Sequence, residues 1–152
     1  MSATSVQTTK TIRKDNRLIE AVNLVLADSY ALMGLAHLAH WNVEGNGFFY
    51  LHKAFEEHYE NLFEAVDAIA ERVRALDAYA IGGLAKLAKT AGMEEFSSPM
   101  SQKDYVAALI VAHEKVMEDA VRARDLAGAA TDLQTQDLMI GRLWMLKSYL
   151  KA

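Results

Sequence analysis

Residues 40–72 read HWNVEGNGFFYLHKAFEEHYENLFEAVDAIAER, and this stretch decides how the rest of the chain is interpreted. A His-Trp pair closes one apolar helical run, and a short break rich in glycine and asparagine follows. The next helical run carries His52 and Glu56 four residues apart, and later Asp67 and Glu71 at the same spacing. Residues four apart lie on one face of an α-helix. The pattern predicts two helices joined by a short turn, with imidazoles and carboxylates along one face of the second helix.

These side chains point to a metal site. Imidazoles and carboxylates on an otherwise apolar face cost free energy unless they are paired, and a divalent metal suits this set of ligands. His52 and Asp67 are about 22 Å apart along a straight helix, so one ion cannot bind both within a chain. If the helix lies antiparallel to its own copy, His52 and Glu56 of one subunit face Asp67 and Glu71 of the other. His40, across the break, can fold back towards His52. The sequence therefore predicts a metal site shared between subunits.

At the same residues the chain resembles the Dps family, the mini-ferritins called DNA-binding proteins from starved cells. The family pattern is His-Trp-Asn, then Gly, an aromatic residue and Leu-His, with an acidic residue one turn later and Asp-x-x-x-Glu-Arg further on. The matching residues here are His40-Trp41-Asn42, Gly45, Phe48, Leu51-His52, Glu56, Asp67, Glu71 and Arg72. Length and helix order match over nearly the whole chain.

The resemblance implies a dodecameric shell of ferritin-like four-helix subunits. Such a shell oxidises Fe(II), with hydrogen peroxide preferred over dioxygen, and stores Fe(III) mineral inside. The implied di-iron ferroxidase site, which also accepts zinc in vitro, takes His40, His52 and Glu56 from one subunit and Asp67 and Glu71 from its two-fold mate. Asp67 and Glu71, assisted by His40, would hold the tighter ion, and His52 and Glu56 would define a second, weaker position.

Two features depart from the family pattern. Many members have Asp where this chain has Glu56, and the longer side chain moves the carboxylate, which would loosen the second iron position. Residues 77–89, DAYAIGGLAKLAK, replace a more usual turn containing Gly-Gly, so the geometry of the crossover stays open. In the family iron enters through an acidic three-fold channel. Asp132 and Asp137, near the start of the last helix, are the candidates for that entrance.

Composition agrees with one compact domain. The chain has 152 residues, of which 52% are hydrophobic and one is proline, which leaves room for several long helices around a core. Cysteine is absent, which excludes disulfides, thiolate zinc sites and cysteine nucleophiles. The sequence shows no signal peptide and, on this interpretation, no apolar run long enough to span a bilayer. A cytoplasmic protein without a membrane partner is expected.

The expected fold is all-α, a ferritin-like four-helix bundle with a short extra helix in the long crossover between helices 2 and 3. The bundle would occupy residues 15–152, behind a flexible tail formed by residues 1–14. Helices are expected over about 15–40, 48–76, 84–88, from 101 onwards, and from 131 to near 150. No glutamate has a histidine three residues later, so the Glu-x-x-His centre of many di-iron bundles is excluded.

Local signals support these boundaries. Leu18, Val22, Val25, Ser29, Met33, Ala36 and His40 form one stripe on the first helix, and Tyr105, Leu109, Ala112, Val116 and Ala123 form another on the third. Ser101 is expected to cap the third long helix. The segment from Thr131 to Gln134 matches a capping box for the fourth.

Plainer interpretations exist for each candidate residue. Asp67 and Glu71 alone would be a solvated helix face with Arg72 and Arg74 as salt partners, and only their register with the histidines outweighs this. His37 is expected to be a hydrogen-bonded core or interface residue.

The other histidines and the tryptophans receive structural interpretations. His58 and His113 are expected at the surface. Trp41 and Trp144 are expected to be packing residues, although the family resemblance suggests that Trp41 also quenches oxidising equivalents in a minor way.

DNA binding is the rival function. The first seventeen residues carry Lys10, Arg13, Lys14 and Arg17 against Asp15 alone, and basic arms bind phosphates through counterion release. Four charges are few, and the net charge of −4 suits a cation-collecting shell better than a DNA-binding one. The expectation is weak, salt-sensitive binding summed over many tails, or none from a merely solubilising tail. A helical oligomer without catalysis is a further alternative, should Glu56 spoil the site.

Overall fold

The computed structural model describes residues 15–150, without the side chains of residues 145, 146 and 148–150. This part of the chain contains helices and no strand. The helices are α1 (Asn16–Asn42), α2 (Phe48–Ala75), α3 (Leu84–Ala91), α4 (Gln102–Ala129) and α5 (Leu133–Leu150). The predicted tail, residues 1–14, lies outside the described residues.

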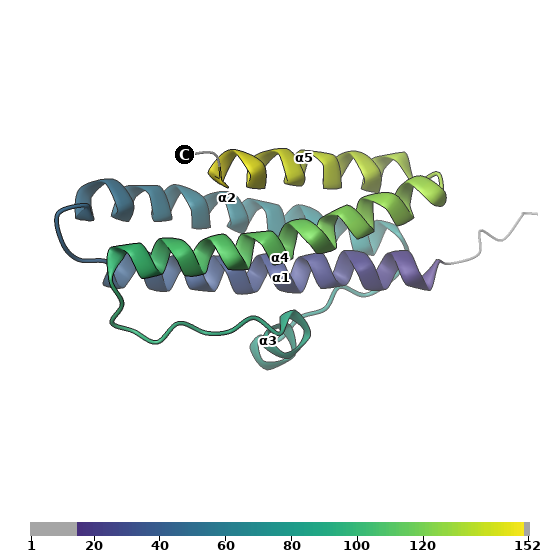
Figure 1. The fold of residues 1–152 in the computed structure, drawn as a ribbon. Coiled ribbons are helices and arrows are strands. Elements are labelled where there is room, and N and C mark those ends of the chain that lie inside the picture. The colour runs from purple at the N-terminus through teal and green to yellow at the C-terminus, as the bar shows by residue number, and fades with distance from the viewer. Residues whose placement is uncertain (1–14, 151–152) are drawn as a thin grey trace, which may run out of the picture.

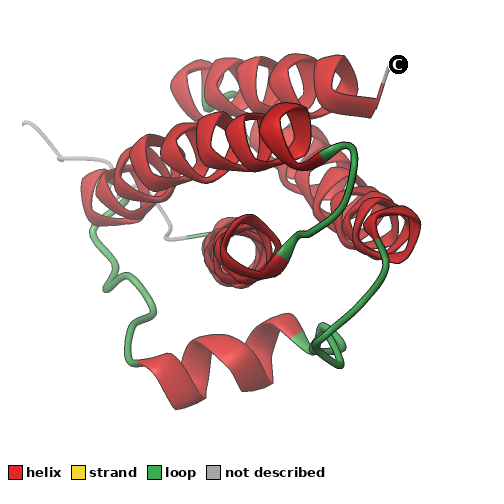
Figure 2. Cartoon of the chain, turned by 90° about the vertical axis from the view of Figure 1, so that its left-hand side faces the viewer, coloured by secondary structure: helices red, strands yellow, loops and turns green. Residues whose placement is uncertain are grey.

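The four long helices lie side by side as a bundle, and the short α3 lies outside it (Figure 1). Two short joints, residues 43–47 and 130–132, connect α1 to α2 and α4 to α5, while residues 76–101 form the long crossover between α2 and α4. Viewed along the bundle, α3 crosses beside α1, on the side away from α5 (Figure 2). The predicted all-α bundle of four long helices, with a short extra helix in the crossover between the second and third of them, is confirmed within the described residues.

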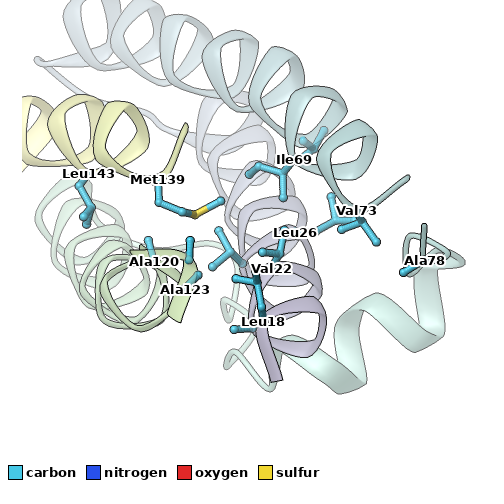
Figure 3. Packing of buried hydrophobic residues seen from close by; sticks show 14 residues of the cluster. Leu18, Val22, Leu26, Ile69, Val73, Ala78, Ala120, Ala123, Met139 and Leu143 are labelled. Atoms are coloured by element: carbon cyan, nitrogen blue, oxygen red, sulfur yellow. The ribbon is translucent and has the colours of Figure 1, made fainter. Parts of the chain in front are cut away.

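Apolar side chains from all four long helices form the core. One cluster joins Leu18 and Val22 of α1 to Ile69 and Val73 of α2 and Met139 of α5 (Figure 3). A second cluster surrounds Leu32, Leu62 and Tyr105 in the other half of the bundle. Every residue of the predicted stripes on α1 and α4 is buried. Full burial of one large aliphatic side chain contributes about 1.5–3 kcal/mol, so the apolar periodicity accounts for the association of these helices.

One of the two predicted N-terminal caps, Ser101, is confirmed, and the structure adds a cap at Asp15. Asp15 accepts hydrogen bonds from the first turn of α1, and Ser101 accepts one from the backbone N–H of Asp104 at 3.1 Å. The capping box predicted from Thr131 is wrong. Thr131 has a left-handed φ of 55°, which the tight turn after α4 requires, and Asp132 caps α5 by accepting from the backbone N–H of Thr135 at 3.1 Å.

One helix contradicts the expectation that no apolar segment is long enough to span a membrane. By length and composition α1 is apolar enough to cross a membrane, with a mean hydropathy of 1.5. The core helix of a bundle passes the same test, and 61% of the apolar window of α1 is buried inside the fold.

His58 and His113 are buried, so the expectation that they lie at the surface is wrong. Their rings stack with centroids 4.3 Å apart, between α2 and α4. Arg142 of α5 is also buried, and its guanidinium donates a hydrogen bond to Asn61 of α2 at 3.1 Å. The interior of the bundle therefore contains a polar cluster, which we call the His58 cluster and define as His58, His113, Arg142 and Asn61. Burial lowers the pKa of His58 to about 3, and the neighbouring His113 and Arg142 add to the effect.

The two tryptophans are not core residues of the single chain. Trp41 is 65% exposed and Trp144 is 67% exposed. Trp41 lies at the end of α1, where its ring stacks on His37 at 4.9 Å. The expectation that both are packing residues is therefore wrong for one chain taken alone, because each presents most of its indole to the outside.

Candidate metal centre

The joint between α1 and α2 brings the first two candidate ligands together. Residues 43–47 reverse the chain, and Gly45 has a φ of 108°, a conformation that side chains other than hydrogen rarely allow. Gln102, at the start of α4, donates from its amide to the carbonyl of Glu44 at 2.5 Å and fixes this joint from the side. The end of α1 and the first turns of α2 are therefore held next to each other.

His40 and His52 form a reciprocal pair across this joint. Their rings stack with centroids 3.8 Å apart. Nδ1 of His40 lies 2.7 Å from the carbonyl oxygen of His52, and Nδ1 of His52 lies 2.8 Å from the carbonyl oxygen of His40. A carbonyl oxygen can only accept, so Nδ1 carries the proton in both rings. Each neutral imidazole then keeps a lone pair on Nε2, which is the arrangement that second-shell hydrogen bonds give to histidine ligands of metals.

Tyr59 also contacts this pair, and the sequence alone did not single it out. Its ring makes an edge contact with His40 at a centroid distance of 5.2 Å, and its centroid lies 4.0 Å from that of His37. Burial raises the pKa of Tyr59 and lowers that of His37. Tyr59 follows His52 by two helical turns, so its place on the same face was available from the spacing.

Glu56 lies one turn after His52, but its carboxylate already has a partner. Nζ of Lys53 lies 2.8 Å from its Oε2, and this hydrogen bond lowers the pKa of Glu56. The pair is largely exposed, so the interaction is weak and a metal ion can displace the ammonium. Lys53, like Tyr59, is a residue at this site that the sequence interpretation missed.

Asp67 and Glu71 lie towards the other end of α2, and both are exposed. Neither makes a hydrogen bond or an ion pair with residues 15–150. Their expected salt partners are engaged elsewhere: Arg72 donates to Thr135 at 2.9 Å and to Gln134 at 2.8 Å, and Arg74 donates to the carbonyl of Ala78 at 2.8 Å. The exposure of Asp67 and Glu71 agrees with the plain interpretation of a solvated helix face, but the salt bridges expected with Arg72 and Arg74 are not formed.

One chain does not assemble a complete site from its described residues. No group of three or more metal-ligating side chains converges within residues 15–150. The structure brings His40 and His52 together, places Glu56 one turn away, and leaves Asp67 and Glu71 far along the same helix. This arrangement agrees with two half-sites at opposite ends of α2.

The two residues suggested for an iron entrance differ in availability. Asp132 accepts from Thr135 as the cap of α5 and lies 3.7 Å from the guanidinium of Arg72. Its carboxylate is therefore occupied by structural contacts. Asp137, one turn further along α5, is exposed and lines a shallow depression of about 390 Å³ together with Leu133, Gln134, Gln136 and Ile140.

Gly45→Ala is expected to lower the free energy of unfolding by about 1–3 kcal/mol, because a positive φ strains an alanine. The added Cβ would also collide with the side chain of Gln102. Urea unfolding at fixed protein concentration measures the change. Gly34→Ala is the control, since a Cβ there meets nothing within 4 Å. That helical glycine should instead give a small stabilisation. Equal effects at both positions would contradict the strain at Gly45.

Comparisons with known proteins identify the family and the fold of the chain. The chain matches the ferritin-like domain family over residues 19–150. It is 36% identical over 144 residues to a low temperature-induced protein of Nostoc sp., covering 89% of this chain and 80% of that protein. It is 27% identical to DNA protection during starvation protein 2 of Bacillus anthracis, covering 90% and 98% of the two chains. The fold is similar to that of a Dps protein from Vibrio cholerae O1, described as one of the ferritin-like diiron-carboxylate proteins, with a TM-score of 0.83, 27% identity and 92% of each chain covered.

Proposed function

The chain belongs to the Dps family of ferritin-like proteins, and from this premise we propose that it oxidises Fe(II) at sites shared between two copies and stores the Fe(III) as mineral. The observation that carries the proposal is the division of ligands along α2. Two imidazoles with Nε2 turned away from their hydrogen bonds lie at one end, and two carboxylates without partners in the described chain lie at the other. Neither end supplies a complete set of ligands by itself, and the two ends together supply two imidazoles and three carboxylates, with Glu56 as the third.

The register of α2 supports an antiparallel pairing of copies. The pair His52 and Glu71 and the pair Glu56 and Asp67 share one midpoint, between Asn61 and Leu62. A two-fold axis passing there would bring both pairs into register at once, and symmetry would then produce two equal sites. Phe63, beside that midpoint, is 67% exposed in the single chain, as expected of a side chain that packs against a partner.

The proposed chemistry needs two iron positions. Asp67 and Glu71 of one copy, with His40 of the other, would hold the tighter Fe(II), and His52 and Glu56 would hold the weaker one. Mixed oxygen and nitrogen ligands suit Fe(II), and zinc would compete for them. Each Fe(II) gives up one electron. The two electrons and two protons convert one hydrogen peroxide into two waters by breaking its O–O bond, and dioxygen would be the slower oxidant.

Mixing two inactive variants tests whether the site is shared. One variant carries His52→Ala with Glu56→Gln, and the other carries Asp67→Asn with Glu71→Gln. Each alone should lose Fe(II) oxidation by peroxide, measured by the absorbance of Fe(III). After co-refolding of equal amounts, half of the pairs are mixed, and one of the two sites in each mixed pair is intact. About one quarter of the wild-type activity should return.

The same mixing experiment distinguishes a shared site from a site within one chain and from an oligomer without catalysis. A site built within one chain would stay inactive after mixing, because no chain would carry all its ligands. A helical oligomer without catalysis would show no peroxide-dependent oxidation even in the wild type. Light scattering on the same samples measures the size of the assembly, for which we propose a dodecamer, and we propose a cytoplasmic location.

DNA protection is the second candidate, favoured by the name of the Bacillus anthracis relative. Of the basic residues near the N-terminus, Arg17 lies exposed in the first turn of α1, and Lys10, Arg13 and Lys14 lie outside the described residues. With so few cations, we propose weak and salt-sensitive binding to duplex DNA or none. Tight retention of DNA at moderate salt would reverse the order of the two functions.

A further inference from the structure

A cavity at one end of the bundle has no role in the proposed iron chemistry. It has a volume of about 710 Å³ and lies where α1 begins, α2 ends and α4 turns into α5. These three segments are far apart in the sequence and each contributes to the lining of the cavity. We call this cavity the end pocket. Its walls are formed by Asp15, Leu18, Ile19, Arg72, Ala75, Leu76, Asp77, Ala130, Thr131 and Asp132.

The end pocket combines an apolar floor with an acidic rim. Leu18, Ile19 and Leu76 supply the apolar surface. Asp15, Asp77 and Asp132 outnumber the one cation, Arg72, and the guanidinium of Arg72 is engaged with the start of α5.

An available carboxylate strengthens this acidic character, whereas the helix ends do not. The C-terminal ends of α2 and α4 and the N-terminal ends of α1 and α5 all lie at the end pocket, so their partial charges offset one another. Asp77 is exposed and, unlike Asp15 and Asp132, caps no helix. The end pocket therefore suits a cationic segment that also carries an apolar side chain.

The chain itself supplies such a segment next to the end pocket. Residues 10–14 read KTIRK, an isoleucine between cations, and Asp15 immediately after them is already part of the wall. Three extended residues span about 10 Å, so Ile12 and Arg13 start within reach of the floor and rim. A tethered segment is present at a high effective concentration, on the order of millimolar, so weak contacts are sufficient to hold it.

We propose that residues 10–14 dock into the end pocket of their own chain, with Ile12 on the apolar floor and the cations against Asp77. The same cations are those that a phosphate backbone would bind. Docking therefore competes with DNA and keeps the basic segment occupied at low salt. The proposal does not depend on iron oxidation at the shared sites.

Limited trypsin digestion of the assembled full-length protein tests the docking. Cleavage after Lys10 and Arg13, followed by mass spectrometry, reports how accessible the segment is. Asp77→Asn removes the charge and keeps a residue that tolerates the left-handed φ of 60° at this position. Cleavage should become about twofold to fivefold faster, the range expected when one exposed ion pair is lost. Ala75→Arg, which places a cation at the mouth of the end pocket, should have the same effect.

Controls distinguish docking from a general charge effect. Glu94→Gln removes one negative charge from an exposed residue of the crossover, outside the end pocket, and should leave the cleavage rate unchanged. Melting temperatures from circular dichroism verify that all variants fold. Equal cleavage rates in the wild type, Asp77→Asn and Ala75→Arg would overturn the proposal.

Two further measurements test whether residues 10–14 occupy the end pocket and whether DNA competes with this docking. A zero-length carbodiimide cross-link between Lys10 or Lys14 and Asp77 should form within single chains. A cross-link that appears only between chains would overturn docking into the chain's own pocket. Asp77→Asn should also bind a duplex DNA fragment about twofold to fivefold more tightly than Glu94→Gln at low salt. Equal DNA affinities would contradict the competition.

Discussion

Replacing Asp67 with Asn and Glu71 with Gln is expected to slow peroxide-dependent oxidation of Fe(II) by at least about 100-fold, because loss of even second-shell partners of a metal costs 10–100-fold. Both substitutions keep the shape of the side chain and remove its charge. In the described chain neither carboxylate makes a structural contact, so the bundle should fold as before. Stopped-flow absorbance under anaerobic loading measures the rate.

A matched pair on another helix provides the control. Glu114 and Glu118 are also exposed and four residues apart, on α4. Glu114→Gln with Glu118→Gln changes the net charge by the same amount, and its oxidation rate should stay within about twofold of the wild type. Equal losses in the two double variants would mean that overall charge attracts iron and that α2 holds no special site.

The second large effect concerns acid stability and comes from the His58 cluster. The pKa of His58 is about 3 in the folded chain and near 6.5 in an unfolded one, because burial disfavours the charged ring. Below about pH 6.5 the unfolded chain therefore binds a proton at His58 that the folded chain does not bind. The contribution of His58 to the free energy of unfolding is fully present above that pH. It falls as the pH drops towards 3, by up to about 1.4 kcal/mol per pH unit.

His58→Phe tests this origin of acid sensitivity, since it keeps a ring at the buried position and removes the titrating group. The free energy of unfolding by urea, measured at one protein concentration between pH 4 and 7, should depend less steeply on pH in the variant. His37→Phe is the comparison, because His37 is less buried and should change the slope far less. Identical slopes in His58→Phe and the wild type would assign the acid sensitivity to other groups.

Much of this fold could be predicted from the sequence because apolar periodicity and helix caps are local properties. The stripe from Leu18 to His40 and the cap at Ser101 correspond to buried residues and to a hydrogen bond in the structure. The approach of His40 to His52 was also predictable, since a glycine-rich joint of a few residues forces two helices to run back alongside each other.

The burial of His58 could have been predicted, because His58 lies between Phe55 and Leu62 on the buried stripe of α2. Its stacked partner on α4, His113, could not be predicted, because it lies more than fifty residues away in the sequence. The engagement of Arg72 with Gln134 and Thr135 is equally non-local.

The reciprocal hydrogen bonds of His40 and His52 have a consequence for how an ion is captured. Each ring uses its Nδ1 proton to hold the helical joint together, so the orientation of both rings is already set within the single chain. In the proposed shared site, binding at Nε2 therefore costs little side-chain conformational entropy. The arrival of the second copy completes the ligand set without a prior rearrangement of this turn.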